Sequence, residues 1–558
     1  MCENQTYNQT PKNEENINDE DSPKRRKTDP KWTIFQHNGP LFPPPYEPLP
    51  DHIPFKYNKI TRTLSPQAEE AATFYAKITN KRLLKDDTFN SNFFKDWRNV
   101  MTEEEKLTIT DFSKCIFRHV RNYFKDKRKE DASEHRKKQI EEQNDFFKEH
   151  YGFCVVDGVS HEIENYKIDS GIFVGRGDHP NTGRIKRRIQ PEDVVVNCSE
   201  DGIPKAPEGH CWKKVVHDNT STWLAKWKDD VLGEDKYVQL KASATLKMEE
   251  DKRKYETAKE LNLKIVEIRK EYWENMFCDD VSVKQRAVAL YFIDNFVFST
   301  GNDKNGDKKA DTVGTCSLRV EHVQLQEKGH IVVFNFLANS SIRYYNEVPV
   351  EEQVFKSLQL FQEDKSPDDR LFDVLTPQDL NCYLKKQMPN LTVRVIRTYN
   401  ASYIFEKFLY LFTAPKNYLD EKIRFHRCAN CVVALLLNHR ATQESEFKKE
   451  TILMAKQDIH YIVALMKRGE VFNKDDSRIR RLFQNLKRLL FKDTEIRLET
   501  SRLNYLDPRI TVAWCKKYGV PIGRIYTKSE EMKKFKWAIE LGDQEYCFSG
   551  ENVLPDQE

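Results

Sequence analysis

The sequence predicts a multidomain α+β protein. Its 558 residues are too many for one compact domain, so several hydrophobic cores are expected. Short strand-like runs, such as VVVNC from Val194 and YVQL from Tyr237, gather in residues 151–245. Helical patterns dominate residues 246–441, where Lys284–Phe298 is apolar on most sides and indicates a buried helix.

Composition narrows the class of protein. Charged residues make up 32% of the chain and the net charge is only +3, a balance that a nucleic-acid binder can have when its lysines and arginines gather on one face. Twelve cysteines without a framework spacing predict reduced thiols in an intracellular protein. No run of about 18 apolar residues occurs, so we expect no membrane span.

The chain opens with a polar tail, residues 1–30, which we expect to be disordered. Its basic cluster Ser22–Lys27 (SPKRRK) fits a nuclear address and a solvated charge run about equally well. Residues 31–245 then predict a mixed α/β lobe, with short helices and aromatic anchors in 66–124 and one long, charged, solvated helix over 125–150.

A glycine-rich, basic stretch lies in the β-rich part, GIFVGRGDHPNTGRIKRRIQP from Gly171 to Pro191. Gly175 and Gly177 let the backbone approach a ligand closely, and Arg176 projects between them. A dense positive cluster with little acid nearby in the sequence follows: Arg184, Lys186, Arg187 and Arg188. This arrangement favours phosphate neutralisation.

The segment Ser501–Tyr518 (SRLNYLDPRITVAWCKKY) carries Tyr505 just before a predicted helix. Asp507 is the expected N-cap and Pro508 the first helical residue. The apolar patch Val512–Trp514 would anchor this helix to a larger body. An arbitrary tyrosine is usually a packed surface residue, so a catalytic role requires partners from elsewhere in the chain.

Extended to SRLNYLDPRITVAWCKKYGVPI, this segment closely resembles the active-site segment of eukaryotic type IB DNA topoisomerases, as NFFKDWR at Asn92–Arg98 resembles their core. The resemblance covers nearly everything from Lys31 to Phe548. It implies a DNA clamp and a mainly helical catalytic domain related to tyrosine recombinases, with Tyr505 as the nucleophile that attacks a DNA phosphodiester. A tyrosine recombinase shares this chemistry, but the long N-terminal region and NYLDPRITVAWC favour the topoisomerase.

Further motifs match the family in order. DTVGTCSLRVEH, VIRTYNAS and LLLNHR align Arg319, Arg397 and His439 with the catalytic arginines and histidine. The resemblance also implies three DNA contacts, Arg176, Lys236 and Asn504. Attack on a phosphodiester builds charge on a five-coordinate phosphorane, which two permanently charged guanidiniums can bridge and a neutral imidazole can assist.

Cofactor motifs are missing from the sequence, and we expect neither metal nor nucleotide. Gly301 and Gly306 have the spacing of a P-loop opening, but Asp307 follows in place of Lys-Ser/Thr. The CxxC of Cys428 and Cys431 stands alone inside an apolar stretch and predicts two core cysteines rather than a zinc site.

One position departs from the family pattern. The family places a lysine, thought to protonate the departing 5′ oxygen, in the turn of a β-hairpin that here runs over His330–Leu337 and on from Ile342. In FLANSSIRYY that place belongs to Asn339, which cannot supply a proton. Losing a positioned general acid costs about 10²–10⁴ in rate, and Lys328 lies too far along the strand to substitute. A DNA-binding clamp with weak or lost cleavage is therefore the alternative.

Residues 442–495 replace the family's linker and predict an antiparallel helical hairpin, Glu444–Arg468 followed by a helix from Ile479 to Leu490. Its outer face carries Arg478, Arg480, Arg481, Lys487 and Arg488. Such a hairpin can protrude along downstream DNA and slow its rotation, or it can be a spacer that delivers Tyr505 to the core.

The leading expectation is a monomeric, nuclear type IB topoisomerase that relaxes supercoiled DNA without ATP. Its partner is double-stranded DNA, with no nucleotide and no membrane. The expected parts are a tail (1–30), an N-terminal clamp lobe (31–245), a catalytic core (246–441), a hairpin linker (442–495) and a C-terminal domain with the tyrosine (496–558).

Overall fold

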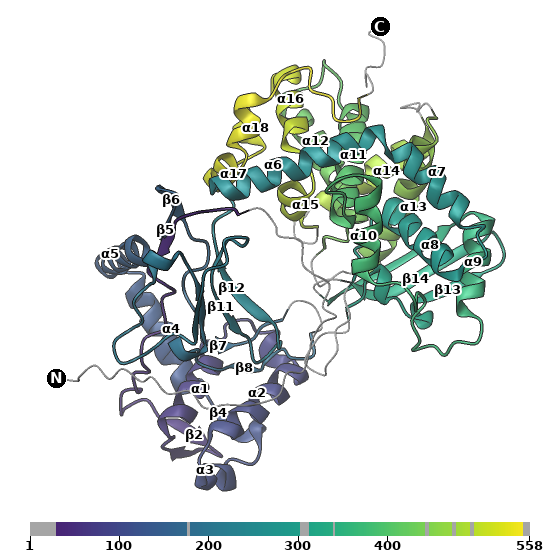
Figure 1. Ribbon diagram of the computed structural model, residues 1–558. Coiled ribbons are helices and arrows are strands. Elements are labelled where there is room, and N and C mark those ends of the chain that lie inside the picture. Colours follow the sequence, from purple (N-terminus) through teal and green to yellow (C-terminus); the bar gives the residue numbers. More distant parts are fainter. Residues whose placement is uncertain are drawn as a thin grey trace, which may run out of the picture.

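The structure is a computed structural model that describes residues 30–175, 179–301, 312–338, 341–440, 446–470, 476–491 and 496–550. Arg176, Asn339 and the basic cluster Ser22–Lys27 lie outside these ranges. A strand-containing N-terminal lobe adjoins a larger, mostly helical body (Figure 1). The predicted α+β multidomain class is confirmed.

Two small sheets form one half of the N-terminal lobe, in the strand orders β1-β5-β6 and β10-β9-β11-β12. Their bounds are β1 (Phe35–His37), β5 (Phe153–Val156), β6 (Val159–Glu162), β9 (Val195–Asn197), β10 (Lys214–Val216), β11 (Trp223–Lys228) and β12 (Asp235–Gln239). Alternate side chains of these strands point inward, so Phe35, Val196, Leu224 and Val238 are buried in a shared core.

Aromatic side chains hold the other half of the lobe. Its elements are β2 (Phe55–Tyr57), β3 (Ile60–Arg62), β4 (Cys115–Ile116), β7 (Gly171–Ile172), β8 (Ile185–Lys186), α1 (Pro66–Ala76), α2 (Asp87–Val100) and α3 (Glu103–Thr108). Phe93 stacks between Tyr75 and Trp97, with ring centroids 4.6 and 5.6 Å away. The indole of Trp97 donates to the Ala68 carbonyl at 2.8 Å. The predicted aromatic anchors in this region are confirmed.

The single helix predicted over residues 125–150 is wrong, because the structure has two helices there. They are α4 (Arg118–Asp131) and α5 (Glu134–Tyr151). The break falls at Ala132 and Ser133, where Ser133 adopts an extended backbone conformation as the N-cap of α5. Most side chains of α5 are exposed, as the mixed charges predicted.

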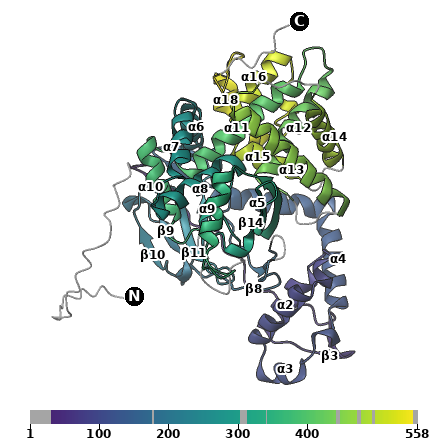
Figure 2. The same ribbon diagram turned by 90° about the vertical axis from the view of Figure 1, so that its right-hand side faces the viewer.

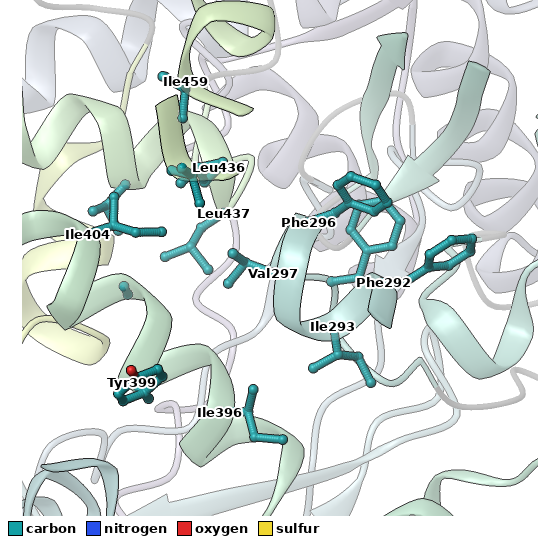
Figure 3. Packing of buried hydrophobic residues seen from close by; sticks show 14 of the residues in the cluster. Phe292, Ile293, Phe296, Val297, Ile396, Tyr399, Ile404, Leu436, Leu437 and Ile459 are labelled. Atoms are coloured by element: carbon teal, nitrogen blue, oxygen red, sulfur yellow. The ribbon is translucent and has the colours of Figure 1, made fainter. Parts of the chain in front are cut away.

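The mainly helical body surrounds one hairpin sheet of order β13-β14-β15. Its elements are α6 (Thr245–Glu260), α7 (Ile265–Asn275), α8 (Val281–Phe296), β13 (Val323–Gln326), β14 (Ile331–Ala338), β15 (Ile342–Pro349), α9 (Glu352–Gln362), α10 (Pro377–Gln387), α11 (Val393–Phe412) and α12 (Leu419–Leu436). The predicted buried helix is α8, with Asp280 as its N-cap. Figure 3 shows Phe292, Phe296, Ile404 and Leu436 of three helices gathered in the core.

The predicted helical hairpin is present as α13 (Glu446–Lys467) and α14 (Ser477–Leu490). Its apolar stripe is covered: Ile459 of α13 and Leu482 of α14 are fully buried in the same core as residues of α8, α11 and α12. Helix α13 contacts β15, α8 and α12, so the hairpin lies along the body (Figure 2). This packing fits the spacer role better than that of a free protrusion.

The chain ends in four short helices, α15 (Leu498–Asn504), α16 (Pro508–Tyr518), α17 (Ser529–Lys534) and α18 (Lys536–Leu541). Cys428 and Cys431 lie fully buried as free thiols in α12, which confirms them as core cysteines. Among the described residues, no cluster of histidine, cysteine or acidic side chains could hold a metal ion. Nor does any described helix combine the length and apolarity that crossing a bilayer requires.

Candidate active site

Tyr505 lies at the C-terminal end of α15, and its amide donates to the Ser501 carbonyl at 2.9 Å. Helix α16 follows with the predicted cap: the Asp507 carboxylate accepts from the Arg509 amide at 2.9 Å, and Pro508 is the first helical residue. Trp514 of α16 is fully buried, which confirms the predicted anchor. The tyrosine is therefore held between two helix ends rather than on a loose loop.

Arg397 reaches the tyrosine from α11. Its Nη1 donates to the Tyr505 Oη at 3.0 Å, and its Nε donates to the Val297 carbonyl at 2.9 Å. Val297 ends α8 in the left-handed conformation, with φ of 56°. Burial lowers the pKa of Arg397 below its ordinary value, but a guanidinium stays charged in proteins. The pair across α11 and α15 thus places a fixed positive charge on the phenol oxygen.

His439 completes the cluster three residues beyond Leu436, the last residue of α12. Its ring centroid lies 5.6 Å from that of Tyr505. Burial, followed by the charge of Arg397, lowers the pKa of His439 to about 3, so the imidazole is neutral at pH 7. Its buried Nδ1 has no hydrogen-bond partner within the described ranges. A neutral imidazole with a spare nitrogen can bind a ligand oxygen.

These three side chains line one cavity of about 560 Å³. Beside apolar side chains such as Phe298 and Phe336, its wall carries arginines and small polar residues: Arg394, Arg440, Arg497, Ser299, Thr300, Thr392, Asn381, Asn438, Thr500 and Asn504. Asn504 lines the same cavity as Tyr505, and its contact with DNA stays a prediction. A cavity with several guanidiniums around a phenol is suited to a phosphodiester, because arginine recognises phosphate oxygens with paired donors.

Three segments of the sequence match models of one protein family. "Eukaryotic DNA topoisomerase I, DNA binding fragment" matches residues 30–240, "Eukaryotic DNA topoisomerase I, catalytic core" matches 243–470, and "C-terminal topoisomerase domain" matches 478–548. DNA topoisomerase 1 of Homo sapiens is 44% identical over 551 residues, covering 93% of this chain and 72% of that protein.

The chain belongs to the eukaryotic DNA topoisomerase I family. DNA topoisomerase 1 of Caenorhabditis elegans is 43% identical over 93% of this chain and 68% of its own length. That of Drosophila melanogaster is 45% identical over 93% of this chain and 55% of its own length. Because the chain carries the catalytic core of this DNA topoisomerase family, it is classed with the isomerase enzymes.

Arg319, the other catalytic arginine that the topoisomerase resemblance implied, lies directly before the short helix Val320–His322 that leads into β13. It does not line the cavity. Its Nε and Nη2 both lie 2.7 Å from Oε1 of Glu321, and its amide donates to the His322 ring at 3.0 Å. An acidic residue two positions away thus pairs with the guanidinium just before β13. The expected grouping of Arg319 with Arg397 at the phosphate stays a prediction.

Sequence reasoning missed three arginines of the cavity, Arg394, Arg440 and Arg497. Arg394 lies three residues before Arg397 on α11, and residues with that spacing share a helix face. Arg440 directly follows His439. Both signals were present in the motifs, whereas Arg497 comes from the segment before α15 and carried no local signal.

The basic cluster of the clamp lobe is paired with acids. Arg184 lies 2.6 Å from Asp96, Arg187 lies 2.9 Å from Asp193 and Arg188 lies 2.7 Å from Glu70. Little acid lies near the cluster in the sequence, but the fold brings Asp96 of α2 and Glu70 of α1 to it. Lys186 lies half-buried on β8, and Lys236 of β12 is 43% exposed and 4.0 Å from Asp229. DNA binding by this cluster stays a prediction.

Proposed function

We propose that this protein is a type IB DNA topoisomerase that clamps duplex DNA and relaxes supercoils without ATP or metal. The observation that carries the proposal is the hydrogen bond of 3.0 Å between Arg397 and the Tyr505 hydroxyl, with neutral His439 beside it in one cavity. Membership of the topoisomerase I family supports the same reaction.

In this mechanism the Tyr505 oxygen attacks the phosphorus of a backbone phosphodiester. The bond from phosphorus to the 5′ oxygen breaks, a 3′-phosphotyrosyl ester forms, and the 5′ oxygen leaves as a hydroxyl after taking up a proton. Arg397 stabilises the charge on the non-bridging oxygens, and His439 donates or accepts a further hydrogen bond. The free end rotates, and its hydroxyl attacks the ester to reseal the strand. Asn504 and Arg176 lie beside the break.

The second candidate function is a DNA clamp of the same fold with weak or lost cleavage. Two considerations favour it. By the resemblance, Asn339 takes the place of the family's proton-donating lysine, and losing a general acid costs about 10²–10⁴ in rate. Arg319 pairs with Glu321 outside the cavity, so the phosphate is expected to meet fewer fixed charges than the resemblance implied.

Either function requires phosphate-mediated binding of double-stranded DNA, largely independent of sequence and weakened steeply by salt. We place the protein in the nucleus as a monomer, with residues 31–245 as the clamp lobe, 246–441 as the catalytic core, 442–495 as the linker and 496–558 as the tyrosine domain. Lys236, Arg184, Lys186, Arg187 and Arg188 are its proposed DNA contacts outside the cavity.

Relaxation of supercoiled plasmid in EDTA without ATP tests the proposal. The parent is compared with Tyr505→Phe and Asn339→Lys. Relaxation by the parent that Tyr505→Phe abolishes would establish the topoisomerase, and the gain on Asn339→Lys would measure the cost of the missing acid. Salt-sensitive DNA binding without relaxation, rescued by Asn339→Lys, would establish the clamp. If neither the parent nor Asn339→Lys relaxes DNA, the assignment of the catalytic residues fails.

A further inference from the structure

The backbone around Tyr505 is held at three successive carbonyls. Lys534 of α17 donates to the Leu503 carbonyl at 2.8 Å, and Lys254 of α6 donates to the Asn504 carbonyl at 3.1 Å. Ser402 of α11 donates to the Tyr505 carbonyl at 3.0 Å. Three different elements therefore fix three adjacent peptide groups, with the proposed nucleophile at the end of the series. Figure 1 shows α6, α15 and α17 side by side.

These carbonyls need partners for a simple reason. The last four carbonyls of a helix accept no hydrogen bond from within that helix, and the partial negative charge of the helix dipole is concentrated on them. Helix α15 has only seven residues, so its own hydrogen bonds fix its last turn weakly. Two ammonium groups at this end satisfy the carbonyls and offset the dipole with bonds of the stronger, charged type.

A carboxylate joins the two lysines. Asp251 of α6 lies 3.0 Å from the Lys254 Nζ and 3.3 Å from the Lys534 Nζ. The lysine side chains are only 12% and 11% exposed, so they contact the protein rather than solvent. Arg394 of α11, which lines the tyrosine cavity, carries a like charge that repels the Lys254 ammonium. Asp251 and the two lysines connect α6, α15 and α17.

We propose that Lys254 and Lys534, joined by Asp251, are positioning residues that hold the end of α15 so that the Tyr505 phenol meets Arg397. The proposal rests on the proposed function for its kinetic consequence. The lysines do not touch the phosphate. They act on the backbone that carries the nucleophile, and a shift there separates the phenol from the guanidinium that lies 3.0 Å away.

The kinetic test uses the full chain with Lys254→Met, Lys534→Met and the double variant. Lys270→Met is the matched control, because Lys270 of α7 is 77% exposed and its ion pair is with Glu274 of the same helix. Single-turnover cleavage of a nicked duplex, whose short downstream fragment with a free 5′ hydroxyl diffuses away, gives the rate constant, and fluorescence anisotropy gives Kd. We expect the double variant to lose at least tenfold in cleavage rate with Kd within twofold, and Lys254→Arg to recover most of the rate.

A second measurement separates failure of this proposal from failure of the proposed function. Amide hydrogen exchange of residues 498–506 reports the last turn of α15 whether or not the parent cleaves DNA. We expect exchange there to be at least tenfold faster in the double variant and unchanged in Lys270→Met. Unchanged exchange in the double variant would overturn the proposal. Equal loss of rate and of DNA affinity, or no recovery with Lys254→Arg, would also overturn it.

Discussion

Replacing Asp294 by alanine removes the carboxylate at the centre of a buried polar group. Asp294 is 3% exposed and accepts from Arg269 at 2.9 and 3.1 Å, from Tyr272 at 3.0 Å and from Asn400 at 3.0 Å. Lys467, the last residue of α13, lies 3.2 Å away. Burial alone would raise the pKa of Asp294, but the charges of Arg269 and Lys467 outweigh it and hold that pKa far below its usual range.

The magnitude follows from the charges left behind. Asp294→Ala leaves Arg269 and Lys467 buried without their counter-charge, and breaking a buried ion pair in this way costs about 3–5 kcal/mol. At roughly 2–4 °C per kcal/mol for a large domain, the melting temperature should fall by about 6–20 °C. The effect should reach the active site, because α8 ends at the Val297 carbonyl that holds Arg397.

Urea unfolding followed by tryptophan fluorescence, together with a thermal melt, measures this loss. The control is Asp368→Ala, an exposed carboxylate whose removal should change the free energy of unfolding by about 0.5 kcal/mol or less. The double variant Asp294→Leu with Lys467→Met removes one negative and one positive charge. Its free energy of unfolding should fall by less than the sum of the losses in the two single variants. A loss below about 1 kcal/mol for Asp294→Ala would refute the account of the buried charges.

Three further predictions concern pH, the C-terminus and the thiols. Burial lowers the pKa of four histidines to about 3–4: His37, His426, His439 and His460. Between pH 6.5 and 4 the unfolded chain therefore binds more protons than the folded protein, and the stability of the fold should fall as the pH falls. Melting temperatures measured from pH 7 to 5 would test this, and we expect a smaller slope in His426→Gln. Phe548→Ala should cost about 3–5 kcal/mol, because its ring is fully buried and its amide donates to buried Glu406 at 2.7 Å; limited proteolysis should then cut the C-terminal segment. Burial raises the pKa of Cys428 to about 12, so iodoacetamide at pH 8 should leave Cys428 and Cys431 unlabelled in the folded protein. A chelator should not change the melting temperature of the protein. Label detected on either thiol by mass spectrometry, or a melting temperature that shifts with the chelator, would contradict this prediction.

The sequence predicted those features whose cause is local. Helix α8 followed from a continuous apolar run, and the start of α16 followed from Asp507 and Pro508. The break before α5 was missed because Ser133 sits in a charged run without glycine or proline. The local sequence pattern could not predict that Tyr505 and Arg397 meet, because 108 residues separate them. Only the family resemblance predicted that contact.

Ion pairs between residues far apart in the chain explain why the sequence could not predict the state of the basic cluster in the N-terminal lobe. Arg188 pairs with Glu70, 118 residues away along the chain, and Arg184 pairs with Asp96, 88 residues away. The sequence around these arginines therefore shows no partner, although both are paired in the fold. Arg319 shows a subtler case. Glu321 was visible two residues away, but the alignment of motifs said nothing about which way the guanidinium turns.

The order of the chain has a consequence for synthesis. The clamp lobe and the arginine of α11 leave the ribosome before Tyr505, which follows Arg397 by 108 residues. At about 5–20 residues per second this gap lasts roughly 5–20 s. Tyr505 then still waits for Lys534 and for Phe548, whose amide closes on Glu406. On the proposed function, a chain that stops before residue 505 carries Arg397 but lacks the nucleophile that breaks the strand.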